Sequence, residues 1–188
     1  MSRAEQTRGQ LDGGHHRGGR SAAPVLDAVS VRDERTDRFV ELSAFLTGYG
    51  RVELTGTGLT GLYLQTLDAV LPAGVVDELL DAFGRLPAGA ISAATAGRDV
   101  AGGALILDDP KLGPVARNVI LLWYCGTWTA LSEAWRAAYG SSPLDASRVV
   151  SAEAYQGALQ WAAAGAHPAG ARQQGFGAWS LTPEGVSG

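Results

Sequence analysis

The chain has 188 residues, of which 46% are hydrophobic, and its formal net charge is -4. This length and composition fit one globular domain with a sizeable core and argue against a chain that is disordered throughout. The charged residues are spread along the chain and form no basic stripe with interleaved aromatic residues, which argues against nucleic-acid binding.

The first 35 residues are rich in Gly, Arg, His, Asp and Ser and have little hydrophobic periodicity. The run Gly13–Gly19 cannot bury apolar surface, so residues 1–35 are predicted to form a flexible tail. His15 and His16 on such a tail would make a poor preformed metal site. The tail has no apolar segment typical of an export signal, and we therefore expect a cytoplasmic protein.

Hydrophobic periodicity predicts three helices in the first half of the chain. In the first predicted helix, apolar residues recur at i, i+3, i+6 and i+7. Pro72 ends the second predicted helix. The residues between these two helices, Arg51 to Gly58, are predicted to form a loop. The three helices are expected at Thr36 or Asp37 to Thr47, Leu59 to Leu71, and Ala73 to Leu86.

The stretch Asp109–Trp128 is expected to form the central element of the fold. Its middle, Val119–Cys125, is apolar on every side, and a helix of this kind has to be surrounded by other elements. Asp and Pro residues at its start and Gly126 at its end are helix-capping signals. The apolar run is too short to cross a bilayer, so no membrane span is predicted. A buried strand is the alternative, because Val, Ile, Trp and Tyr also favour sheets.

Two further helices are predicted in the second half of the chain. Ala130–Tyr139 has amphipathic spacing, Gly140–Ser147 is interpreted as a polar turn, and a last helix runs from about Ser147 or Ser151 to Ala164. Pro87–Asp108, rich in Ala and Gly, is predicted to form a surface loop with one helical turn, or an extended arm. The predicted fold is all-α: a single helical domain of about five to six helices at residues 36–165, with an extended C-terminal docking tail at residues 166–188.

Most sequence signatures of catalysis and cofactor binding are missing, including the P-loop, H-E-x-x-H, Cys-x-x-Cys and G-x-S-x-G. Cys125 is the only cysteine, which excludes an intramolecular disulfide, and its hydrophobic surroundings are typical of a packing residue. Glu153 and His167 can act as an acid–base pair only if the fold brings them together. No catalytic, cofactor-binding or metal-binding residue is therefore assigned in this chain.

Aromatic residues are concentrated in the second half of the chain. Trp123, Trp135 and Trp161 are interpreted as core residues. Phe176 and Trp179 lie on a Gly-rich segment without helical or strand periodicity, which has few local contacts to hold it. Aromatic residues on such a segment are common anchors of protein interfaces, and intramolecular packing is the equal alternative.

Five short segments, taken in order, resemble the small-subunit family of membrane-bound FAD-dependent sugar and polyol dehydrogenases, which includes the small subunits of fructose dehydrogenase. Each segment is short, but together they span roughly Phe39 to Pro183. They are FVELSAFLTG (Phe39–Gly48), LLWYCGTW (Leu121–Trp128), AYQGALQW (Ala154–Trp161), HPAG (His167–Gly170) and GFGAW (Gly175–Trp179).

The resemblance implies a non-catalytic accessory subunit that aids the stability or maturation of a larger partner. That partner would be a large subunit of the glucose–methanol–choline (GMC) oxidoreductase type, which holds FAD and oxidises a sugar hydroxyl. A cytochrome c subunit often accepts the electrons in such complexes. This chain carries no cofactor itself and departs from the family pattern in lacking a twin-arginine export signal. We expect Pro87–Asp108 and His167–Pro183 to clasp the partner, and the predicted interface residues are Trp128, His167, Pro168, Phe176 and Trp179.

Two alternatives belong to other functional classes. One is a stand-alone helical chaperone or binding module, which predicts a transient and sub-stoichiometric complex. The other is a small enzyme that uses His167 with Glu153 or Tyr155, which predicts an activity of the isolated chain that His167→Ala abolishes.

Overall fold

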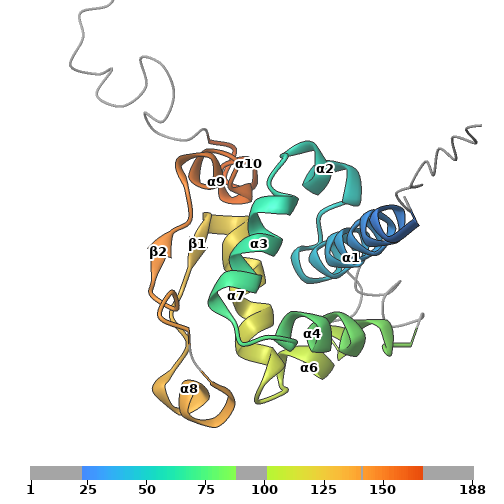
Figure 1. Ribbon diagram of the computed structural model, residues 1–188. Coiled ribbons are helices and arrows are strands. Elements are labelled where there is room, and N and C mark those ends of the chain that lie inside the picture. Colours follow the sequence, from blue (N-terminus) through green and yellow to red (C-terminus); the bar gives the residue numbers. More distant parts are fainter. Residues whose placement is uncertain (1–22, 88–100, 141, 167–188) are drawn as a thin grey trace, which may run out of the picture.

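At the centre of the computed structural model lies α7 (Leu112–Cys125), around which the other elements are arranged (Figure 1). The structure describes residues 23–87, 101–140 and 142–166. These residues are mostly helical, which confirms the predicted all-α domain. In chain order the remaining elements are α1 (Ala23–Thr47), α2 (Arg51–Gly56), α3 (Thr60–Val70), α4 (Val75–Gly84), α6 (Ala101–Leu107), β1 (Thr127–Trp128), α8 (Glu133–Tyr139), β2 (Arg148–Val149), α9 (Ala152–Gln156) and α10 (Leu159–Ala163).

The helix predictions are confirmed where local signals and burial agree. α3 and α4 lie inside the predicted ranges, and their apolar faces enter the core through residues such as Tyr63 and Leu80, both 0% exposed. α7 is a helix and not the alternative buried strand. It begins after the Asp109 carboxylate, which accepts hydrogen bonds from the backbone N–H of Lys111 and Leu112 at 2.8 and 2.7 Å. It ends at Gly126, as predicted.

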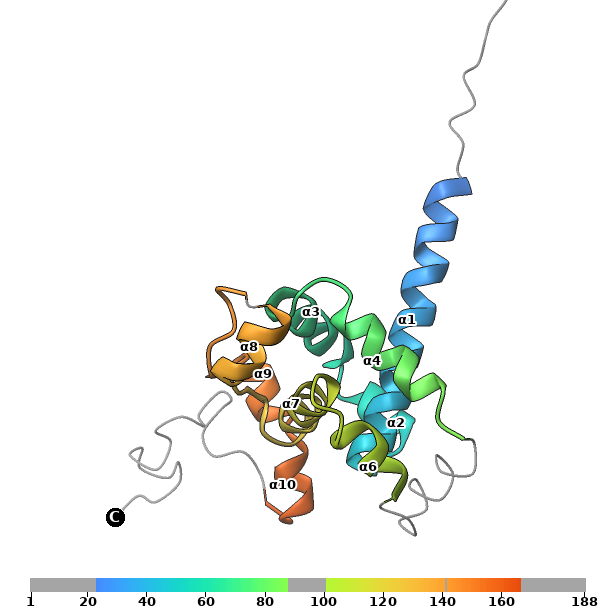
Figure 2. The ribbon, with the colours of Figure 1, turned by 90° about the horizontal axis from the view of Figure 1, so that it is seen from below.

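Two predictions for the first half of the chain are wrong. α1 begins at Ala23 and not at Thr36 or Asp37, and its first part projects beyond the rest of the domain (Figure 2); residues 1–22 of the predicted tail lie outside the described residues. The predicted loop at Arg51–Gly58 contains α2. Glu53 stabilises the start of α2 by accepting a 2.8 Å hydrogen bond from the Gly50 N–H.

The second half of the chain also differs from its prediction. Arg148–Val149 pairs with Thr127–Trp128 as a short antiparallel sheet, with Trp128 opposite Arg148. The predicted last helix is two short helices, α9 and α10, which are separated at Gly157. Ser151 caps α9, because its hydroxyl accepts a 3.0 Å hydrogen bond from the Ala154 N–H. Within Pro87–Asp108 the structure describes α6, and residues 88–100 lie outside the described residues.

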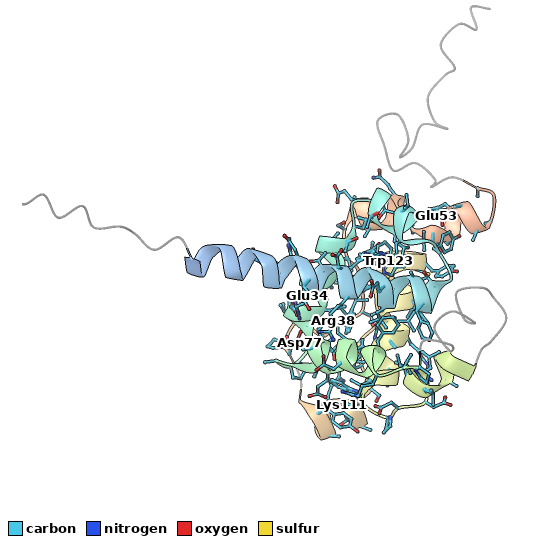
Figure 3. The ribbon with its side chains drawn as sticks, turned by 90° about the vertical axis from the view of Figure 1, so that its right-hand side faces the viewer. Glu34, Arg38, Glu53, Asp77, Lys111 and Trp123 are labelled. Atoms are coloured by element: carbon cyan, nitrogen blue, oxygen red, sulfur yellow. The ribbon has the colours of Figure 1, made fainter. Side chains whose placement is uncertain are left out.

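Ion pairs connect α1 to α3 and α4, and connect α4 to the residue before α7, on the exposed side of the domain. Arg35 of α1 donates to Asp68 and Asp77 at 2.7 Å, and the hydrogen bond with Asp68 is the main reason why the pKa of Arg35 is raised. Arg38 pairs with Asp81 at 2.6 Å, and Lys111 pairs with Glu78 at 2.5 Å. Figure 3 labels Arg38, Asp77 and Lys111 on this side. These exposed pairs orient α4, but each contributes little to stability.

Candidate functional site

Only one of the five predicted interface residues, Trp128, lies in the part of the chain that the structure describes. Trp128 is 0% exposed, so its side chain packs inside the domain and is not the exposed anchor that we expected. His167, Pro168, Phe176 and Trp179 lie outside the described residues.

A buried carboxylate explains the position of Trp128. Asp145, with 1% of its side chain exposed, accepts a 2.8 Å hydrogen bond from the Trp128 indole N–H. The same carboxylate accepts hydrogen bonds from the Leu131 N–H at 3.2 and 3.3 Å, and a guanidinium nitrogen of Arg136 lies 3.6 Å away. Asp145 thereby joins β1, the start of α8 and the loop before β2. This network holds the structure together and leaves Trp128 no free donor.

Two of the three residues of the enzyme alternative, Glu153 and Tyr155, lie in the described part of the chain. Glu153 is exposed, and its pKa is lowered by a hydrogen bond from its own backbone N–H and then by the Ser151 hydroxyl. A lowered pKa keeps a carboxyl group ionised near neutral pH, where it has no proton to donate and is a weaker general base. Tyr155 lies edge-on to Trp161, with the ring centroids 5.2 Å apart, and its backbone carbonyl accepts the Trp161 indole N–H at 2.7 Å. The proposed base, His167, lies outside the described residues.

Three of the five segments that carry the family resemblance meet at the C-terminal end of α7. Tyr124, in the segment Leu121–Trp128, donates a 3.0 Å hydrogen bond from its hydroxyl to the carbonyl of Thr47, in the segment Phe39–Gly48. The Tyr124 ring also lies edge-on to Tyr49, with the ring centroids 5.9 Å apart. Partial burial raises the pKa of Tyr124, with a smaller contribution from Tyr49. The hydroxyl therefore remains protonated and can donate at physiological pH.

The third segment joins the other two at Gly126. This residue ends α7 with φ of 65°, in the left-handed region that glycine adopts without strain. A side chain here would collide with α9, because a Cβ atom would lie 2.5 Å from the carbonyl carbon and oxygen of Ala154. The Gly126 carbonyl in turn accepts a 2.9 Å hydrogen bond from the Val150 N–H. Gly126 thus permits close contact between the segments Leu121–Trp128 and Ala154–Trp161.

A buried polar pair lies on the core side of the same helix end. The rings of Tyr63 and Trp123 meet edge-on, with centroids 4.8 Å apart, and both residues are 0% exposed (Figure 3 labels Trp123). Neither the Tyr63 hydroxyl nor the Trp123 indole N–H has a hydrogen-bond partner in the part of the chain that the structure describes. Burial, with a smaller contribution from Cys125, raises the pKa of Tyr63 far above its usual range. The pair is therefore an uncharged part of the core.

Sequence reasoning missed the contacts that place these groups. Asp145 lies in a stretch predicted to be a polar turn. No local sequence pattern indicates that its carboxylate would be buried against the Trp128 indole N–H. The contact between Tyr124 and Thr47 joins residues 77 positions apart, so only the fold shows it. Gly126 carried a usable signal as a helix end, but that signal says nothing about the approach of Ala154.

Among the described residues, no group of three or more His, Cys, Asp or Glu side chains is arranged to hold a metal ion. No helix in these residues combines the length and the apolar character needed to span a membrane. No protein-family model matches the chain, and none of the curated proteins or solved structures compared with it is significantly similar. A functional assignment therefore depends on the sequence motifs and on the geometry of the end of α7.

Proposed function

We propose that this chain is a non-catalytic small subunit that binds and stabilises a large FAD-dependent dehydrogenase or oxidase subunit of the GMC type. The large subunit would hold FAD and oxidise a hydroxyl group of a sugar, polyol or alcohol. A cytochrome c subunit would accept the electrons in complexes that contain one. The small subunit would aid the folding and maturation of the large subunit and would provide a binding surface for it. The large subunit would carry out the oxidation.

The observation that supports this proposal is the convergence of the three described motif segments. Contact between these segments is also what a fold shared with that family would show. Here Tyr124 bonds to Thr47, and Gly126 packs against Ala154, so the three segments form one structural unit. Such a unit is what a shared fold would require, and the resemblance supplies the function that goes with that fold.

Co-expression tests the proposal. The chain would be produced alone and together with each GMC-type flavoprotein encoded in the source genome, and analysed by size exclusion with absorbance at the flavin bands. We expect one large subunit to co-elute with the chain in a fixed ratio, with flavin absorbance only when that subunit is present. A chain that elutes alone beside every flavoprotein would contradict the proposal.

The same preparation separates the two alternatives. A transient chaperone would raise the yield of soluble flavoprotein but co-elute at well below an equal ratio. An independent enzyme would oxidise or hydrolyse a substrate without the flavoprotein and would lose that activity in the His167→Ala variant. The proposed small subunit requires a stable complex at a fixed ratio, and the isolated chain would then have no activity for His167→Ala to abolish.

A further inference from the structure

The central helix leaves one of its faces partly uncovered. Arg117, Ile120, Leu121 and Tyr124 are partly or fully exposed, and their spacing of i, i+3, i+4 and i+7 places them on one side of α7. We call these four residues the α7 face. Leu122, on the opposite side, is 0% exposed. The expectation that α7 would be surrounded on every side is therefore wrong for this face, which is apolar at Ile120 and Leu121.

Short helices lie beside the α7 face at its two ends. α6 packs against the N-terminal part of α7, where Arg117 donates a 2.8 Å hydrogen bond to the carbonyl of Leu107. α6 also carries Leu105, which is 64% exposed. α10 contacts α7 as well, and Figure 2, which shows α7 end-on, places both α6 and α10 below it. Ile120 and Leu121 thus lie beside these two helices with their side chains only partly covered.

The chain segments predicted to clasp a partner are connected to these same two helices. The first of these segments, Pro87–Asp108, contains α6, and the second, His167–Pro183, follows shortly after α10. Leu121 and Tyr124 also belong to one of the motif segments. The positions of α6 and α10 therefore indicate the side of the domain on which we expect a partner.

We propose that the α7 face is the surface on which the large FAD-containing subunit docks, and this inference rests on the proposed function. The docking surface of that subunit would be apolar opposite Ile120 and Leu121 and would carry a carboxylate opposite the exposed guanidinium of Arg117. An apolar helix side of this kind is a common binding element when a partner contributes an apolar segment. Binding would complete the burial of a helix whose sequence is apolar on every side.

A charge placed on the α7 face tests the inference. Leu121→Lys should weaken binding of the large subunit about tenfold or more, because an interface anchor would be replaced by a desolvated charge. The matched control is Leu144→Lys in the loop before β2, where the leucine is already 54% exposed and lies off α7. Leu121→Ser provides a milder change, and the thermal unfolding of each isolated variant shows whether its fold is intact.

Cys125 supplies an independent measurement, because it is the only cysteine, is partly exposed and adjoins the α7 face. Its rate of reaction with a maleimide reagent would be compared in the free chain and in the complex. We expect the large subunit to slow the reaction about tenfold or more, as occlusion of a thiol does. Leu144→Lys should show the same protection as the unchanged chain.

The outcomes separate this inference from the proposed function. If a complex forms, the α7 face is excluded as the docking surface when Leu121→Lys binds normally and Cys125 stays reactive. If no complex forms with any large subunit, the proposed function fails and the inference fails with it. A thiol that is slow in the free chain and becomes fast after deletion of residues 167–188 would assign the α7 face to the chain's own C-terminal segment, and would also overturn the inference.

Discussion

Two fully buried tryptophans, five positions apart in the chain, have opposite surroundings. The indole N–H of Trp128 donates to the buried Asp145 carboxylate, which also binds the Leu131 N–H. The indole N–H of Trp123 has no hydrogen-bond partner in the described part of the chain, and neither does the hydroxyl of Tyr63 against which it packs. Gly126 lies between the two tryptophans and separates the two regions.

The difference shows that polar groups hold one region and apolar contact holds the other. Around Trp128, the hydrogen bonds join segments that are distant in sequence. Loss of the one shared acceptor would therefore leave more than one buried donor without a hydrogen bond. Around Trp123, edge-on ring contact and burial of apolar area stabilise the core, while the two unpaired polar groups oppose it. Substitutions in the two regions should therefore have effects of different size and even of different sign.

The largest effect is expected from Asp145→Ala. The change leaves the buried donors of Trp128 and Leu131 without an acceptor, and it should lower the free energy of unfolding by about 3–5 kcal/mol. Urea denaturation at neutral pH measures this loss. Asp145→Asn keeps an acceptor oxygen for Trp128 and should cost clearly less. A loss below about 1 kcal/mol for Asp145→Ala would mean that water replaces the carboxylate, and that Trp128 is not held as described.

Gly126→Ala should have the next largest effect, about 2–4 kcal/mol, from left-handed strain together with the collision with Ala154. Gly48→Ala is the matched control. Gly48 has φ of 77° but no atom within 4 Å of the position that a Cβ would take, so its variant should show the strain alone, about 1–2 kcal/mol. Chemical denaturation of the two variants measures the difference, which reports the close approach of α9. Equal losses would show that α9 moves aside without cost.

Tyr124→Phe should cost about 1 kcal/mol, because it removes one hydrogen bond and leaves the Thr47 carbonyl without that donor. Tyr49→Phe keeps the ring that contacts Tyr124 and serves as the control, with an expected change near zero. The thermal midpoints of the two variants, measured side by side, test the assignment. If the two midpoints coincide, the hydrogen bond between the motif segments adds nothing to stability.

The same contrast explains which parts of the structure could be predicted from the sequence. α3, α4 and the end of α7 were predictable, because apolar periodicity, Pro72 and Gly126 are local signals. α2 was not, since Leu54 is its one buried residue and a single anchor gives no period. The pairing of Trp128 with Asp145 also had no local signal, because a carboxylate in a polar stretch becomes buried only when the fold presents donors to it. The candidate site depends on contacts between residues that are distant in sequence. The motifs could therefore be recognised in the sequence, but the contacts between them could not be predicted from it.

The smallest effect on stability is expected from Tyr63→Phe, and it is expected to be neutral or stabilising. The substitution keeps the ring contact with Trp123 and removes a buried hydroxyl that has no partner among the described residues, so the free energy of unfolding should stay unchanged or rise by up to about 1 kcal/mol. A loss of more than about 1 kcal/mol in urea denaturation would show that the hydroxyl has a hydrogen-bond partner in solution, such as an internal water.

Alkaline pH tests the same hydroxyl by a second route. Burial raises the pKa of Tyr63 above its ordinary value of 10.0, so the unfolded chain releases this proton at a lower pH than the folded chain does. Ionisation of Tyr63 in the unfolded chain therefore lowers the free energy of unfolding as the pH rises beyond about 10, and has no effect well below that pH. Tyr63→Phe should lose less stability than the unchanged chain between about pH 9 and 11, while Tyr124→Phe, which retains Tyr63, should keep most of the alkaline loss. If Tyr63→Phe loses as much stability as the unchanged chain over this range, the hydroxyl is not buried in solution, and the contrast between Trp123 and Trp128 would then reduce to one of packing alone.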